Sequence, residues 1–118
     1  MPDKRSQARN RGKAWERLVA KLLGGIRRGP DFRGPDGGKD DVIHPHFSIE
    51  CKNMAQLNYR AILAACYQSE LNCPDTKEPI AIVKPPGTKW QDAMVCQRLE
   101  EWRKWRIGDP DETIQKGE

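Results

Sequence analysis

Apolar residues near the N-terminus recur with the period of a helix. Within residues 12–26, "GKAWERLVAKLLGGI", they fall at positions i, i+3, i+4, i+7, i+8 and i+11: Trp15, Leu18, Val19, Leu22, Leu23 and Ile26. This spacing predicts an amphipathic helix, and Gly24-Gly25 predicts its end. Residues 1–10 before it are polar and basic, so we expect a flexible arm there.

Two short strands are predicted next, over residues 41–44 and 47–52, joined at Pro45-His46. In the second strand Phe47, Ile49 and Cys51 alternate with Ser48, Glu50 and Lys52. Glu50 and Lys52 therefore share one face, about 7 Å apart along the strand. Residues 27–39 are rich in Gly and Pro and predict a loop, with at most a short strand around residues 26–28.

The remaining chain predicts two more helices and two more strands. Residues 55–72 read as a helix with one face of mostly small residues that would pack on a sheet: Leu57, Ala61, Ala64, Ala65, Gln68 and Leu71. Strands are expected at 79–84 and 93–97, and a last helix at 99–106. This order predicts an α/β fold with a small mixed sheet flanked by helices. We expect one domain over residues 11–107 and a flexible tail over 108–118.

The charge is unevenly distributed along the chain. Its net value is +4, but residues 1–39 hold 11 Lys and Arg against 4 Asp and Glu, a net +7. Residues 40–118 hold 10 against 13, a net −3. A basic N-terminal third suits a polyanion, and nucleic acid is the default partner. The alternative is a basic surface that only keeps the protein in solution.

The composition bears on the cellular location of the protein and on the state of its cysteines. The N-terminus lacks the apolar segment of a signal peptide, and no segment approaches the length of a membrane span. We therefore expect a cytoplasmic protein, in the host cytoplasm if phage-encoded, whose four cysteines are free thiols. The spacings of the cysteines and of His44 and His46 match no zinc-binding pattern, which favours buried structural thiols.

Candidate chemistry lies on the two central strands. Asp41 opens the first strand, and pairing of the two strands would bring it near Glu50 and Lys52. Two neighbouring carboxylates repel each other and are costly to bury unless a cation lies between them. Mg²⁺ prefers such oxygen ligands, and it can activate water and stabilise charge on a scissile phosphate. Lys52 could hold the attacking water, and the Cys51 carbonyl could be a further ligand.

The pattern Asp-(x8)-Glu-x-Lys resembles the PD-(D/E)XK nuclease motif, and the order of elements resembles the restriction-endonuclease-like fold. Within that superfamily the chain is similar to small Holliday junction resolvases of the archaeal and phage type, over roughly residues 10–100. The matching residues are Glu16 in "GKAWERLVAKLL", Asp41 in "GGKDDVI", and Glu50 and Lys52 in "FSIECKN".

The resemblance implies a metal-dependent DNA endonuclease that acts as a homodimer and cuts two strands of a four-way junction symmetrically. Asp41 and Glu50 would bind Mg²⁺, for which Mn²⁺ can substitute, and Glu16 would complete the metal shell. Lys52 would position the water, and Gln68 would be an auxiliary residue. The basic N-terminal third would hold the phosphates: Arg9, Arg11, Lys13, Arg17, Arg27, Arg28, Arg33 and Lys39.

Several alternatives stay open at this stage. Asp36, in "GPD", matches the literal Pro-Asp of the motif, and Asp40 is a third candidate; we prefer Asp41 because an apolar pair follows it directly. The substrate could instead be linear duplex, a flap or a single strand. The aspartates could also form a plain turn, and Glu50 and Lys52 a solvated edge. In that case the protein would be a DNA-binding module without catalytic activity.

Three tryptophans lie in the C-terminal third. Trp90, Trp102 and Trp105 could stack on bases. The spacing of Trp102 and Trp105 is more typical of packing, and a dimer interface is one place for it.

Overall fold

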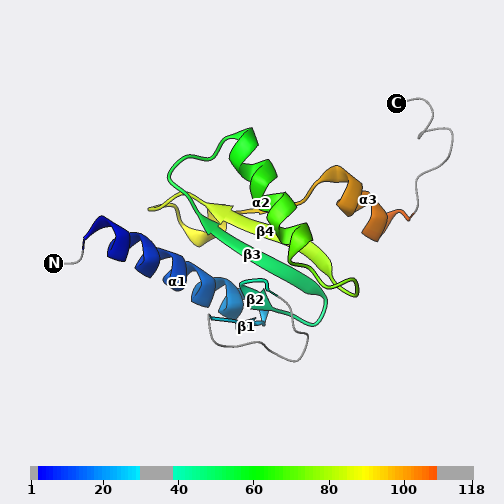
Figure 1. The fold of residues 1–118 in the computed structure, drawn as a ribbon, viewed down its shortest axis with the longest axis horizontal. Helices are drawn as coiled ribbons and strands as arrows, with labels where there is room; N and C mark the ends of the chain where they lie inside the picture. The colour runs from blue at the N-terminus through cyan, green and yellow to red at the C-terminus, as the bar shows by residue number, and fades with distance from the viewer. Residues whose placement is uncertain (1–2, 30–38, 109–118) are drawn as a thin grey trace.

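The fold is given by a computed structural model that describes residues 3–29 and 39–108 (Figure 1). Its helices are α1 (Lys4–Leu23), α2 (Tyr59–Leu71) and α3 (Leu99–Arg106), with a short 3-10 helix η1 (Trp90–Asp92). Its strands are β1 (Ile26–Arg27), β2 (Val42–Ile43), β3 (Phe47–Asn53), β4 (Glu78–Lys84) and β5 (Met94–Cys96).

The five strands form one mixed sheet in chain order, β1-β2-β3-β4-β5. The β3–β4 pair is parallel and the other three pairs are antiparallel. The parallel pair requires a crossover connection, and α2 provides it. The predicted mixed α/β fold, with a small sheet flanked by helices, is confirmed.

Helices α1 and α2 cover opposite faces of the sheet. On one face Trp15 and Val19 of α1 pack with Ile49 of β3 and other apolar strand residues. On the other face Ala65 of α2 packs with Ala81 and other residues of β4. Figure 1 shows β3 and β4 lying between the two helices. The alternation of β3 therefore directs Ile49 toward α1 and its neighbour Glu50 toward the side of α2.

Helix α1 is longer than the sequence predicted. It begins at Lys4, so residues 4–10, expected to form a flexible arm, are helical. Asp3 caps this end, because its side chain accepts a hydrogen bond from the Ser6 N–H at 2.8 Å. The helix ends at Gly24 in the left-handed conformation, with φ of 72°. The predicted C-terminal end is therefore confirmed, whereas the predicted start is wrong.

Helix α2 begins at Tyr59, after an Asn58 cap, and buries a different face from the predicted one. Ala65, Cys66 and Ser69 are buried, whereas Leu71 is 85% exposed. Relative to the predicted orientation, α2 is rotated about its axis by about one residue position, so that Cys66 and Ser69 are buried. The buried hydroxyl of Ser69 is satisfied because it donates to the Cys66 carbonyl at 2.7 Å.

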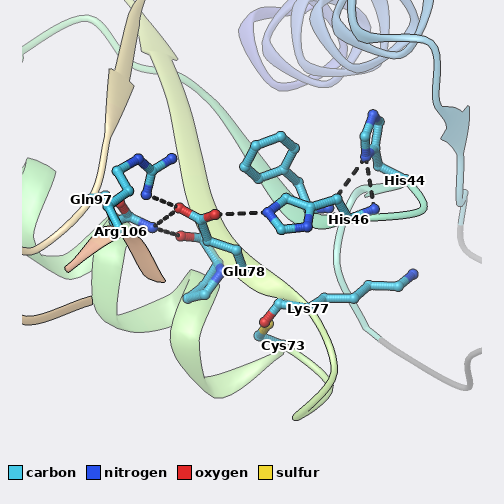
Figure 2. A network of polar contacts seen from close by, with 9 residues as sticks. His44, His46, Cys73, Lys77, Glu78, Gln97 and Arg106 are labelled. Carbon is cyan, nitrogen blue, oxygen red and sulfur yellow. Dashed lines mark hydrogen bonds and ion pairs between the residues drawn. The ribbon is translucent and has the colours of Figure 1, made fainter. Parts of the chain in front are cut away.

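Helix α3 has no buried residue and is attached to the sheet by polar contacts (Figure 2). The Glu78 carboxylate accepts from Arg106 Nη1 at 2.6 Å and from Gln97 Nε2 at 2.8 Å, and it lies 2.9 Å from His46 Nε2. Burial opposes ionisation of Glu78, but hydrogen bonds from these three side chains lower its pKa overall. A buried charged group thus fixes α3 to the first residue of β4.

All four cysteines are free thiols, as predicted. Within residues 3–29 and 39–108, none of the helices has the length and apolar character needed to cross a membrane.

Candidate metal and nucleic-acid site

The β2–β3 pairing brings the two central carboxylates together. Val42 pairs with Ile49, so continuing this antiparallel register by one residue places Asp41 opposite Glu50. The Asp41 N–H donates to the Ile49 carbonyl at 2.9 Å, and its Oδ2 accepts from the Cys51 N–H at 2.8 Å. Asp41 therefore stands directly before β2 rather than inside the strand predicted over residues 41–44.

An open hollow of about 490 Å³ lies at these carboxylates. The predicted catalytic and auxiliary residues all line it: Glu16, Asp41, Glu50, Cys51, Lys52 and Gln68. They come from α1, the start of β2, β3 and α2. Because β2 pairs with β3 only as far as Ile49, the last residues of β3 extend past it, and Glu16 of α1 lines the same opening.

Glu50 is a deeply buried acid of the hollow, with 1% of its surface exposed. Burial, followed by the negative charge of Asp41, raises the pKa of Glu50 to about 8. A hydrogen bond from Asn72 Nδ2 to Glu50 Oε1, at 2.9 Å, and the charge of Lys52 act in the opposite direction. A cation beside Glu50 would favour its ionised form.

Glu16 is part of the same electrostatic cluster. Burial and then the charge of Asp41 raise its pKa, while Arg27 on β1 counteracts them. Arg27 Nε donates to Glu16 Oε2 at 3.4 Å. Burial also raises the pKa of the Cys51 thiol, and the charges of Asp41, Glu16 and Glu50 add to this effect. The acids Glu16, Asp41 and Glu50 therefore act on the same part of β3.

The two adjacent aspartates have different surroundings. Asp40 is 1% exposed, and its Oδ1 is ion-paired with Arg28, whose Nε donates to it at 3.0 Å. Its Oδ2 accepts from the Ser48 hydroxyl at 2.7 Å. Both Asp40 oxygens are thus engaged inside the protein, whereas Asp41 is half-buried. The third candidate, Asp36, lies outside the described residues.

The predicted DNA-binding residues divide into separate groups. Arg9, Lys13, Arg27 and Lys39 line the hollow, although Arg27 also contacts Glu16. Arg28 lines it too, but it is 6% exposed and its guanidinium is ion-paired with Asp40 inside the protein.

Two of the other three basic residues lie elsewhere. Arg11 lines a second hollow, next to Trp15 and Lys84. Arg17 is exposed on α1, and Arg33 lies outside the described residues.

The oxygen donors of the hollow are of the kind that Mg²⁺ takes in proteins. In the described part of the chain no three His, Cys, Asp or Glu side chains are arranged to hold a metal ion. Mg²⁺ commonly takes one or two carboxylates and completes its shell with water and substrate phosphate. Asp41, Glu50 and the Cys51 carbonyl supply such a set, in a hollow open enough to admit a phosphate.

The sequence did not predict two contacts of these acids: the hydrogen bond from Asn72 to Glu50 and the one from Arg27 to Glu16. The contact between Asn72 and Glu50 joins residues 22 positions apart, and the sequence carries no signal for it.

No protein-family model, curated protein or solved structure matches this chain. A proposal about the function of the protein therefore depends on the geometry of the hollow.

Proposed function

We propose that this protein is a Mg²⁺-dependent DNA endonuclease of the PD-(D/E)XK type, with a restriction-endonuclease-like fold. One observation carries the proposal: Asp41 and Glu50 lie side by side with Lys52 in an open hollow that basic residues surround. The topology supports it, because a helix precedes the hairpin and a crossover helix follows it.

The residues of the hollow have distinct roles in this proposal. Asp41, Glu50 and the Cys51 carbonyl would hold Mg²⁺, and Glu16 would extend the acidic set from α1. When bound, the ion would supply an activated water and stabilise charge on the phosphate. Lys52 holds the attacking water, since its ammonium group extends from the same face of β3 as Glu50.

The substrate's phosphates are held by the basic rim of the hollow. Arg9 and Lys13 lie one helical turn apart on α1, and Lys39, just before Asp40, lines the same hollow. Cationic groups around an acidic centre allow a polyanion to approach it. The resulting affinity depends on salt.

The most specific form of the proposal is a Holliday junction resolvase, a homodimer whose two sites cut opposite strands. Support for a dimer comes from β5 and α3, where large apolar residues are 45–75% exposed: Met94, Val95, Leu99 and Trp102. Helix α3 has acidic residues in its first turn and basic residues in its last. Two antiparallel copies of α3 would pair these charges across a two-fold axis.

Cleavage of labelled DNA tests the proposal. A four-way junction, a linear duplex and a single strand of the same sequence are incubated with Mg²⁺ or with EDTA. We expect paired, symmetric nicks in the junction alone, lost in EDTA and in Glu50→Gln. Equal cutting of all three substrates would retain the nuclease and reject junction specificity. Binding without cutting in either Mg²⁺ or Mn²⁺ would reject the nuclease in favour of a binding module.

A further inference from the structure

The Glu50 carboxylate has a side-chain donor that the proposed reaction does not use. Asn72 Nδ2 donates to Glu50 Oε1 at 2.9 Å. Glu50 is 1% exposed, so water has little access to it. A buried carboxylate needs hydrogen-bond donors, and one that accepts a bond on a single oxygen loses its freedom to rotate.

The backbone fixes the position of Asn72. It is the residue that ends α2, and its own N–H donates to the Gln68 carbonyl at 3.0 Å. Helix α2 is in turn packed on β4 through Ala65. The amide of Asn72 is therefore presented to Glu50 by a helix end anchored on the sheet.

The two central acids are held in the same way. Asp41 accepts one N–H on Oδ2, from the backbone of Cys51, and Glu50 accepts one N–H on Oε1, from Asn72. Each acid thus has one oxygen oriented by an N–H donor. Partners of this kind orient metal ligands, and their loss commonly weakens metal binding by about 10–100-fold.

We propose that Asn72 is a positioning residue that orients the Glu50 carboxylate for a divalent cation. The role rests on the proposed metal site, and it links the end of α2 to that site. Asn72 itself does not touch the ion.

Binding of Mn²⁺ alone, without DNA, tests the role by calorimetry and by electron paramagnetic resonance of the free ion. We expect Asn72→Ala to weaken Mn²⁺ binding by about 10–100-fold. The matched control is Asn58→Ala at the other end of α2, where the Asn58 side chain accepts from the Ala61 N–H at 2.8 Å. It destabilises the same helix away from the hollow, so we expect Mn²⁺ affinity within about twofold of wild type.

The outcomes separate the role of Asn72 from the metal site itself. Unchanged Mn²⁺ affinity in Asn72→Ala, with binding lost in Glu50→Gln, would overturn the positioning role and leave the proposed function intact. An equal loss in Asn58→Ala would also overturn it, because the effect would then come from α2 as a whole. Wild-type protein that binds Mn²⁺ no better than Glu50→Gln would overturn the metal site and Asn72's role together. If Asn72→Ala does not fold, Asn72→Ser, too short to reach Glu50, carries the same expectation.

Discussion

At the scale of single residues, the buried acid Glu50 makes the stability of the protein depend on pH. The pKa of Glu50 in the folded protein is about 8, above its ordinary value of 4.5. Between these two values the folded state binds the proton more strongly than the unfolded state does. The free energy of unfolding of the metal-free protein must therefore fall as pH rises through this window.

Replacing Glu50 by Gln isolates this effect. We expect wild type in EDTA to lose stability, relative to Glu50→Gln, on the order of 2 kcal/mol between pH 5 and pH 8, because relaxation of the protein around a buried charge offsets part of its cost. Urea unfolding at the two pH values measures it, and comparing the two proteins cancels most other titrations. If the free energies of unfolding of the two proteins changed with pH in parallel, the raised pKa of Glu50 would be contradicted.

The neighbouring aspartates give a second prediction at this scale. Asp40→Asn breaks the buried pair with Arg28 and should destabilise the protein by about 3 kcal/mol. Asp41→Asn keeps an oxygen that can accept from the Cys51 N–H and relieves repulsion with Glu50, so its cost should stay below about 1 kcal/mol. It should nevertheless abolish Mn²⁺ binding. Urea unfolding with Mn²⁺ titration distinguishes the two, and the reverse order would refute the assignment of Asp41.

At the scale of elements, the sequence predicted β3 and its neighbours well. Side chains alternate along a strand with a period of two, so the faces of Glu50 and Cys51 followed once the strand was recognised. The start of α1 was missed because residues 4–10 carry no apolar period, although Asp3 is a local capping signal. The buried face of α2 was misplaced because small residues occur on several of its sides. Asn72 could not be found, since its contact depends on where α2 ends relative to β3.

The faces of α1 lead to a prediction about DNA binding. Arg9 lines the hollow with the acids, whereas Arg11 lies at a different hollow beside Trp15. Arg9→Ala should weaken DNA binding and lower the slope of log affinity against log salt by about 1. Arg11→Ala removes an equal charge from the same helix and should leave the slope nearly unchanged. Fluorescence anisotropy at several salt concentrations measures both, and equal changes would reject the hollow as the DNA-contacting face.

At the scale of the whole molecule, α3 is the element that the rest of the fold explains least. A helix with no buried residue is held by the buried Glu78 carboxylate, and its apolar residues Leu99 and Trp102 remain exposed. Exposed apolar surface of this kind commonly marks an interface. The opposite charges at the two ends of α3 suit contact with a second copy.

Two exposed tryptophans test the dimer. Trp102 on α3 is 45% exposed and Trp90 on η1 is 47% exposed, so the pair is matched in type and accessibility. We expect a wild-type dimer, which Trp102→Glu converts to a monomer because a charge would be buried in the interface. Trp90→Glu should remain dimeric. Sedimentation velocity measures the three proteins; a monomeric wild type, or equal effects of both variants, would contradict an interface at α3.

The most direct test of the central claim is the single-turnover rate at which wild type, Lys52→Met and Lys89→Met cut a labelled four-way junction in Mg²⁺. Lys52 lines the hollow, and Lys89 is an exposed lysine before η1. We predict symmetric cutting by wild type and by Lys89→Met, with the rate reduced by about 10²-fold or more in Lys52→Met. A wild-type protein that cuts no DNA, or one that Lys52→Met matches in rate, would contradict catalysis in this hollow.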